Sequence, residues 1–448
     1  MSDGQRERTA TFGEVFAVGE FRALFVGDIV SSVGDMLARV AVTFLVWQQT
    51  GNVLLTVATF AISYAPYLIG APVLAALAER YPYRRTMITC DLLRMGLIGL
   101  VAIPGTPLWA MLVLLFLVSA VTPAEKAARS ALLPQVLEGE RYAVALSAVS
   151  IARQSAQLAG YFAGGVLAGV NAHLALGIDA ATFAFSALLL TLFVRTRAPG
   201  ALRSDRSNLF KEAGQGITFV FGHPVLRSIA LLVFCMVGCA IVPEAAAPAW
   251  AAHLHGGSLA QGAIMASAPV GSAIGVLVMG RFMSATTRQK LIRPLAIIAP
   301  MLLIPALFDP PVWLVLPMAA GVNMIGGVLL ALNTLFVQAL PGNFRARAFG
   351  VMQSGLMIAQ GTAVIGMGLV AQAVPSIAEA VGLWGIAGVI LVSILVLTWP
   401  SASTIEEAKS AAKPPVVEPP AEAPAPPAAP AAGPEPVRGR SGAAKAEA

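Results

Sequence analysis

Residues 75–85 read Ala75-Ala76-Leu77-Ala78-Glu79-Arg80-Tyr81-Pro82-Tyr83-Arg84-Arg85 and connect two long apolar runs. This basic connection is one of five in the chain, and the five alternate strictly with six connections that contain no Lys or Arg. Lys and Arg accumulate on the cytoplasmic side when apolar spans insert into a bilayer. The alternation therefore predicts twelve membrane spans with both termini in the cytoplasm. The expected spans cover residues 21–48, 54–78, 86–103, 107–125, 143–170, 172–195, 223–250, 257–283, 291–308, 311–339, 346–373 and 375–399.

The composition excludes a soluble protein. Hydrophobic residues make up 57% of the chain and charged residues 12%, whereas about a quarter of a soluble domain is charged. The net charge of +6 is spread over several connections, where it orients the spans and meets anionic lipid, so no nucleic-acid partner is expected. Cys and His residues show no metal-type spacing, and we expect neither a metal nor a cofactor.

The spans divide into two similar halves. Gly70 precedes Arg80 by ten positions, and Gly271 precedes Arg281 by ten, each before a basic connection. Each half contains an even number of spans, so the two copies share one orientation, which is typical of alternating-access transporters with a substrate site between the halves. We expect a cytoplasmic N-terminus (1–20), an N-terminal six-helix bundle (21–195), a cytoplasmic linker (196–222), a C-terminal six-helix bundle (223–399) and a disordered, Pro/Ala-rich cytoplasmic tail (400–448).

The quoted connection resembles the signature loop of the major facilitator superfamily, Gly-x-x-x-Asp-Arg-x-x-Gly-Arg-Arg. Ala75 stands in place of the first Gly, Glu79 in place of Asp and Tyr83 in place of the second Gly. The resemblance implies an all-α polytopic membrane protein of twelve helices in two parallel six-helix repeats. It also implies a cytoplasmic gate built from Glu79, Arg80, Arg84 and Arg85, with Asp91 and Arg94 within reach.

Other stretches are similar to one branch of that superfamily, the drug:proton antiporter-3 exporters, which include macrolide-efflux proteins. They are Phe21-Arg22-Ala23-Leu24-Phe25, Gly34-Asp35, Asp91-Leu92-Leu93-Arg94 and Asp179-Ala180-Ala181-Thr182-Phe183. Gly160-x-x-x-Gly164-Gly165 is similar to the antiporter motif of exporters but lacks its usual proline. These three glycines also predict close packing of a neighbouring helix.

Charged residues inside the first predicted span are candidates for function, because an ionisable group in the bilayer is costly unless it is paired or hydrated. Asp28 and Asp35 share a face seven residues apart, and Arg39 follows Asp35 by four. Either Asp35 and Asp28 line a cavity as proton- or cation-binding carboxylates, or Asp35 and Arg39 form a permanent structural ion pair.

Two later spans add candidates for the same cavity. Arg153, Gln154 and Gln157 lie in the fifth span, where Asp35 is the expected partner of Arg153 and Asp179 the second choice. Glu244 lies between Pro243 and Pro248 and is a candidate for coupling or gating. The eleventh span has only uncharged Gln residues at the corresponding depth, so proton chemistry is expected in the first half.

The predicted function is secondary active transport, with proton-coupled efflux of amphipathic or hydrophobic small molecules such as drugs, macrolides or siderophore-like compounds. An importer, a facilitator or a lipid flippase on the same fold remains open. A polytopic membrane enzyme is a remote alternative, since no catalytic cluster is evident in the sequence. The expected partners are a small-molecule substrate, protons and membrane lipid, and the expected form is a monomer in the plasma membrane.

Overall fold

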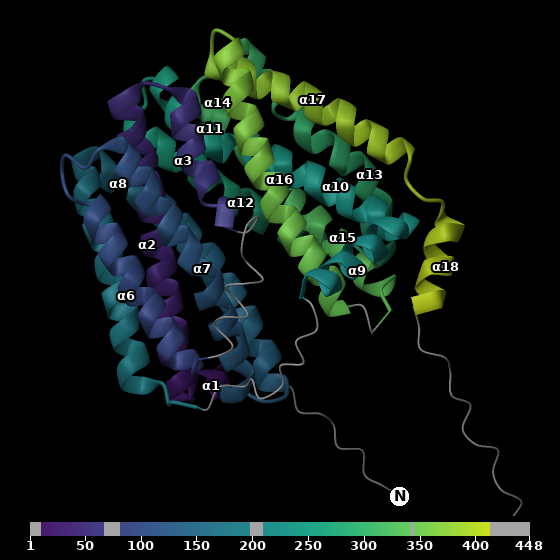
Figure 1. Cartoon of the computed structure of the whole chain (residues 1–448). Coiled ribbons are helices and arrows are strands. Elements are labelled where there is room, and N and C mark those ends of the chain that lie inside the picture. Colours follow the sequence, from purple (N-terminus) through teal and green to yellow (C-terminus); the bar gives the residue numbers. More distant parts are fainter. Residues whose placement is uncertain (1–9, 67–80, 198–208, 342–344, 413–448) are drawn as a thin grey trace, which may run out of the picture. The chain divides into compact units, whose positions relative to one another are not determined.

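A computed structural model describes residues 10–66, 81–197, 209–341 and 345–412, and all secondary structure in these ranges is helical (Figure 1). The helices are α1 (Phe12–Phe16), α2 (Gly19–Thr50), α3 (Val53–Ile62), α6 (Tyr83–Val101), α7 (Leu108–Val136), α8 (Glu140–Phe193), α9 (Leu209–Gly222), α10 (Pro224–Ala240), α11 (Val242–His253), α12 (Gly257–Phe282), α13 (Ala285–Met301), the 3₁₀ helix η1 (Ile304–Phe308), α14 (Val312–Asn323), α15 (Ile325–Gln338), α16 (Arg345–Ala373), α17 (Ile377–Leu397) and α18 (Ala402–Ala412).

Nine helical stretches in the described ranges are long and apolar enough to cross a membrane. One of them, α8, contains two expected spans, because the backbone leaves helical geometry at Asn171 with φ −162° and ψ 105°. The Asn171 side chain then accepts a hydrogen bond from the Leu174 N–H and starts the second part of the helix. The break falls at the residue where the sequence predicts the connection between the fifth and sixth spans.

The second and third expected spans are not among these nine stretches. Helix α6 carries Arg84, Arg85, Asp91 and Arg94, which lower its mean hydropathy. Helix α3 covers only the beginning of the expected second span, and residues 67–80 lie outside the described part. The all-helical, polytopic fold class predicted from the sequence is confirmed.

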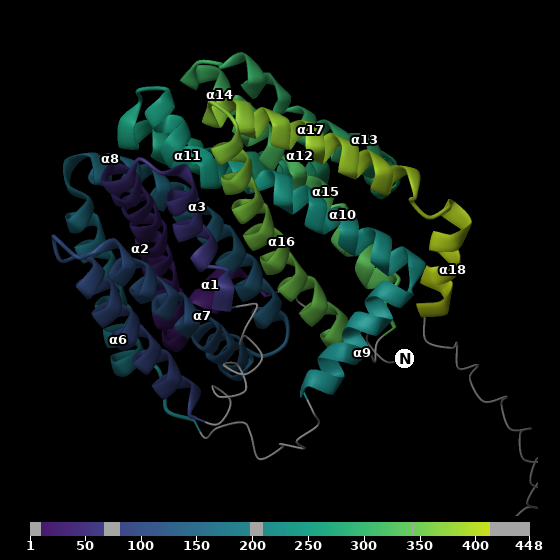
Figure 2. The same ribbon diagram turned by 45° about the horizontal axis from the view of Figure 1, so that its top comes forward.

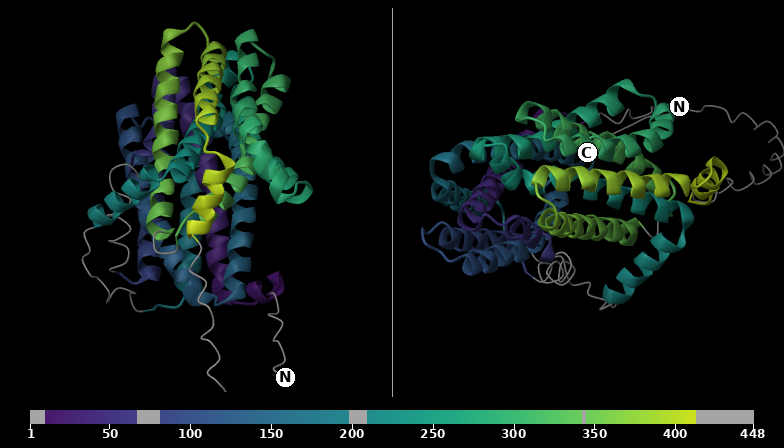
Figure 3. Two further views of the ribbon diagram at one scale, coloured as in Figure 1. Left: turned by 90° about the vertical axis from the view of Figure 1, so that its right-hand side faces the viewer. Right: turned by 90° about the horizontal axis from the view of Figure 1, so that it is seen from above.

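The helices before residue 194, α2 to α8, are called the first-half helices here, and α10 to α17 the second-half helices. Figure 3 shows the first-half helices, purple to blue, gathered on one side of the structure and most second-half helices, green to yellow, on the other. Within the first half, α8 packs along α2 because glycines leave room for the backbones. A Cβ atom on Gly160 would lie 2.7 Å from the Val33 carbonyl oxygen, and one on Gly164 would lie 3.0 Å from the Val40 side chain.

The two halves contact each other near the end that carries the connections without Lys or Arg, called the arginine-free end below. There a Cβ on Gly165 would lie 2.8 Å from the Ser258 carbonyl oxygen and 2.9 Å from the Gly262 Cα, so α8 and α12 cross without intervening side chains. Gly361 of α16 lies against Tyr64, just beyond α3. Toward the opposite, arginine-rich end the two groups of helices diverge (Figures 1 and 2).

Two expectations about non-membrane segments are changed by the structure. Residues 209–222, part of the expected linker, form α9, which packs on α16 and α10. The prediction of disorder from residue 400 is wrong for residues 402–412, which form α18. This stretch contains no proline, is rich in Ala and Glu, and begins where the Ser401 hydroxyl accepts a hydrogen bond from the Thr404 N–H. Residues 413–448 lie outside the described part.

Candidate functional site

A cavity of about 630 Å³ lies between the first-half and second-half helices. The described residues that line it distribute charge very unevenly. Eight charged side chains come from α2, α6, α7 and α8, namely Asp28, Asp35, Arg39, Arg94, Glu125, Lys126, Arg153 and Asp179. The described second-half wall contributes one charged residue, Glu244, and is otherwise apolar or uncharged, with Val237, Ile241, Ile325, Leu329 and Met357 beside Ser272, Asn323 and Gln360. The cavity is therefore charged on one side and largely apolar on the other.

The first charged cluster surrounds Asp28. The Arg153 guanidinium donates two hydrogen bonds to this carboxylate, at 2.8 and 2.9 Å, and Arg129 Nε approaches it at 3.5 Å. Arg129 also donates to Glu125 at 2.7 Å and to the Leu24 carbonyl oxygen at 2.8 Å. The prediction that Arg153 pairs with Asp35 or Asp179 is wrong. Depth explains the difference, because Arg153 and Asp28 both lie in the part of their helices toward the arginine-rich end, whereas Asp35 lies two turns deeper.

The second cluster surrounds Arg94. Its Nη2 donates to Asp35 Oδ1 at 2.6 Å, and its guanidinium carbon lies 4.2 Å from the centre of the Phe183 ring. In this structure Arg94 therefore pairs with Asp35 inside the cavity and not at the helix end, where the sequence analysis expects the gate. Arg94 is eleven residues into α6, so its side chain reaches the cavity rather than the connection before the helix. Asp91, expected at the same gate, is buried one turn earlier on α6.

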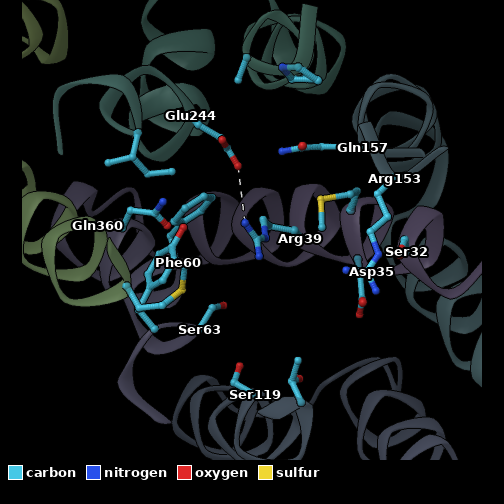
Figure 4. Close-up of a pocket in the computed structure, with 18 of the residues that line it drawn as sticks. Ser32, Asp35, Arg39, Phe60, Ser63, Ser119, Arg153, Gln157, Glu244 and Gln360 are labelled. Carbon is cyan, nitrogen blue, oxygen red and sulfur yellow. Dashed lines mark ion pairs between the residues drawn. The ribbon is translucent and has the colours of Figure 1, made fainter. Parts of the chain in front are cut away.

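The third cluster joins the two halves. Arg39 of α2 and Glu244 of α11 form an ion pair with 3.5 Å between Nη1 and Oε1 (Figure 4). The buried Tyr161 hydroxyl of α8 donates a hydrogen bond to the same Glu244 oxygen. The alternative prediction of a structural Asp35–Arg39 pair is wrong, since each residue has another partner. We call Arg39, Glu244 and Tyr161 the inter-half clasp.

Uncharged polar residues complete the cavity. Gln154 and Gln157 line it as the sequence predicts. The sequence reasoning missed Gln261 of α12, a buried residue that does not line the cavity. Its amide donates to the Val40 carbonyl oxygen at 3.0 Å and to the Thr43 hydroxyl at 2.8 Å, across the two halves. The sequence reasoning also missed the Glu125–Arg129 pair. The signal was present, because an acid followed by Arg four residues later within an apolar helix predicts a paired, inward-facing couple.

The residues of the expected cytoplasmic gate are only partly in the described ranges. Glu79 and Arg80 lie outside them, and Arg84 and Arg85 lie in the first turn of α6. Arg84 donates to the Leu190 carbonyl oxygen at 3.1 Å and to the Thr196 hydroxyl at 2.7 Å, which fixes the end of α8. Nearby, Arg197 donates two hydrogen bonds to Glu20 at 2.6 and 2.8 Å, and these bonds raise the pKa of Arg197 above its ordinary value.

The described residues contain no group of three or more Cys, His, Asp or Glu side chains that could hold a metal ion. His253, which the sequence leaves without an acidic neighbour, in fact contacts Asp309 at 2.8 Å. The two residues are distant in sequence and meet because α11 and η1 end side by side. A single such pair does not provide a metal site.

Comparisons with known proteins place this geometry in a family. Residues 24–364 match the family described as the Major Facilitator Superfamily. A variant of the nucleoside transporter NupG has a similar structure, with a TM-score of 0.70, 13% identity, and coverage of 85% of this chain and 100% of that one. A bacterial homologue of the human lysosomal transporter Spinster, in an inward-facing and occupied conformation, gives a TM-score of 0.64 at 14% identity, with 88% and 96% covered.

A bacterial homologue of the iron transporter ferroportin, in an inward-facing state, gives a TM-score of 0.63 at 11% identity, with 90% and 100% covered. At these identities the similarity concerns the fold alone. No curated protein matches the sequence significantly. The family match extends over most of the chain and agrees with the helical architecture and the central cavity. The chain therefore belongs to the Major Facilitator Superfamily and is a multi-pass membrane transporter rather than an enzyme.

Proposed function

We propose that this transporter is a proton-coupled exporter of amphipathic small molecules that works by alternating access. The observation that carries the proposal is the division of the cavity into a charged first-half wall and a mainly apolar second-half wall. A substrate with a polar or charged part and an apolar body matches both walls at once. Pockets that combine apolar surface with a few polar anchors bind such molecules.

The orientation is compatible with export and defines the state from which export starts. We place the arginine-rich end in the cytoplasm, because Lys and Arg are retained there during insertion. The halves are in contact at the arginine-free end, through Gly165, Ser258 and Gly262, so the described conformation is closed on the outer side. A substrate then enters from the cytoplasm and leaves after the two bundles, residues 21–195 and 223–399, rock about the cavity.

Proton coupling is supported by carboxylates on the cavity wall. Asp28, Asp35, Asp179 and Glu244 all line it, and changes in the partners of such groups alter their affinity for protons. The protein then works as a monomer in the plasma membrane and uses the inward proton gradient to drive outward movement of substrate.

Proteoliposomes with an internal pH dye test this proposal. Amphipathic compounds, including a macrolide and the lipophilic cation tetraphenylphosphonium, are added in the presence of a pH gradient. We expect substrate-dependent proton flux with the wild type, its loss in Asp35→Asn, and its retention in Glu379→Gln, which alters a carboxylate outside the cavity. Substrate accumulation that follows the proton inward would instead identify an importer. Transport of every tested compound without proton flux would refute the coupling.

A further inference from the structure

We propose that Asp35, Arg94 and Asp179 form an exchange site that binds one organic cation in place of one proton. The inference rests on the proposed function and deepens it, since it assigns the charge of the substrate and the residue that holds the proton. It is carried by the contacts of these three residues, which come from α2, α6 and α8 respectively.

Arg94 has unused hydrogen-bonding capacity. Its side chain is only 6% exposed, and its Nε has no hydrogen-bond partner in the described part of the chain. A guanidinium offers five N–H donors, and here the Asp35 carboxylate accepts at Nη2 while the Phe183 ring covers one face. Arg94 is thus a cation that can pair with a second carboxylate without leaving its place in α6.

Asp179 is a carboxylate next to Arg94 that forms no ion pair within hydrogen-bonding distance in the described part of the chain. The residue is 1% exposed, its Oδ1 receives a hydrogen bond from the Thr182 hydroxyl, and its Oδ2 has no partner among the described residues. Gly34 provides the space for this carboxyl group, because a Cβ atom at residue 34 would collide with Asp179 Oδ1. An ionised carboxylate in such a site lacks compensation for the loss of water, so in this conformation Asp179 holds a proton.

The charged groups around Asp179 also favour its protonated form. The charged groups that act on it directly are Asp35 from α2 and Arg94 from α6, while Asp91 of α6 and Glu125 of α7 act on Arg94. The described residues that line the cavity include five carboxylates and four cations, so one carboxylate is left without a counter-charge. The carboxylates are Asp28, Asp35, Glu125, Asp179 and Glu244, and the cations are Arg39, Arg94, Lys126 and Arg153. The buried pair of charges Asp91 and Arg129, which do not line the cavity, leaves this difference unchanged. A single proton neutralises the set.

A ligand in the cavity can bind to Asp35. Its side chain is 33% exposed to the cavity, whereas that of its partner Arg94 is buried. A group that competes with Arg94 for this carboxylate must be positively charged. When a cation binds Asp35, Arg94 turns to Asp179, the Asp179 O–H bond breaks, and the proton leaves through the cavity that Asp179 lines. One positive charge enters and one leaves, so the net charge of the site is unchanged.

Infrared difference spectroscopy on the purified, substrate-free protein tests the location of the proton. The wild type at neutral pH is expected to show the C=O stretch of a protonated carboxylic acid, and Asp179→Asn is expected to lose it. Asp91→Asn is the matched variant, since Asp91 is equally buried and also has an unpartnered Oδ2 but does not line the cavity. Loss of the band in Asp91→Asn and its persistence in Asp179→Asn would overturn the assignment.

Binding of tetraphenylphosphonium in detergent, followed together with a pH-indicator dye, tests the exchange. We expect the wild type to release a proton on binding, Asp179→Asn to bind without release, and Asp35→Asn to bind roughly tenfold more weakly or worse, because an ionic partner is lost. Equal proton release by wild type and Asp179→Asn, or undiminished binding by Asp35→Asn, would overturn the proposal. These measurements need no transport, so they fail or succeed independently of the proposed export.

Discussion

Arg39 in the first membrane helix and Glu244 in α11 form an ion pair across the two halves, with 3.5 Å between Nη1 and Oε1. Tyr161 hydrogen-bonds to the same carboxylate, and Gln261 joins the halves close by. The inter-half clasp lies on the way to the arginine-free end, where α8 and α12 cross. Opening of that end requires α2 and α8 to separate from α11 and α12, so the clasp must break in each transport cycle.

Glu244→Gln is expected to shift the protein toward the state open at the arginine-free end. A hydrogen bond to a charged group contributes about 1.5–3 kcal/mol, which corresponds to a population change of roughly tenfold to a hundredfold. Ser258, buried beside Gly165, provides the measurement. In a background without native cysteines, Ser258→Cys should react faster with a membrane-impermeant maleimide when Glu244→Gln is present. Glu379→Gln serves as the control, and equal labelling in all three proteins would contradict a role for the clasp.

Gly34→Ala is expected to abolish most proton-coupled transport while the protein still inserts and folds. The new methyl group would collide with both Asp179 Oδ1 and Thr182 Oγ1, so the carboxyl group would have to leave its present position beside Arg94. Gly96→Ala is the matched control, because a Cβ atom there meets no heavy atom within 4 Å. Transport normalised to the amount of folded protein, judged by size-exclusion chromatography, checks the prediction. Normal transport by Gly34→Ala would show that the position of Asp179 is not important.

Arg129→Met should destabilise the protein more than Arg153→Met. Arg129 is buried and compensates both Asp28 and Glu125, so its loss leaves uncompensated buried charge, at a cost of about 3–5 kcal/mol. Arg153 has a side chain that is 41% exposed, and without it Asp28 retains Arg129. Thermal unfolding of the two purified variants in the same detergent measures the difference. A larger loss of thermal stability in Arg153→Met would reverse this ranking.

Removal of residues 413–448 should leave transport intact, whereas truncation after Pro400 should reduce the amount of folded protein. The longer truncation deletes α18, whose Ala408 is buried and whose Ile405 packs against the apolar core. Residues beyond 412 are rich in Pro and Ala and lack an apolar run that could anchor them. Expression level and transport per molecule distinguish the two truncations, and a strong loss in the shorter one would contradict the prediction.

The positions of most spans could be predicted because they depend on local composition. A continuous apolar run must be helical in lipid, and the chain can reverse only where polar or helix-breaking residues occur, as at Asn171. Segments at the border between two kinds of composition were harder to predict. The expected disorder after residue 400 extended the composition of the proline-rich tail backwards over residues 402–412, which contain no proline.

The identity of the cavity residues could also be predicted, because a charged side chain within a membrane-spanning helix must face the protein interior or a hydrated cavity. Their partners were not. Asp35 and Arg39 are four residues apart, but Arg39 turns toward Glu244 and Asp35 toward Arg94, on helices that are distant in sequence. Pairing of buried charges depends on the depth and rotation of neighbouring helices, and neither quantity is encoded in the spacing along one helix.

The unequal distribution of charge between the two cavity walls has a consequence for how such proteins diversify. The second-half wall of the cavity includes Ile325, Leu329 and Met357, none of which takes part in the charge network, and in the proposed function these side chains contact the apolar part of the substrate. Exchanges among apolar residues there alter the shape that a compound must fit while the first-half carboxylates and arginines stay as they are. Substrate selectivity and proton coupling can thus evolve separately. Substitutions on the apolar second-half wall can change the substrate while the charged residues of the first-half wall are retained.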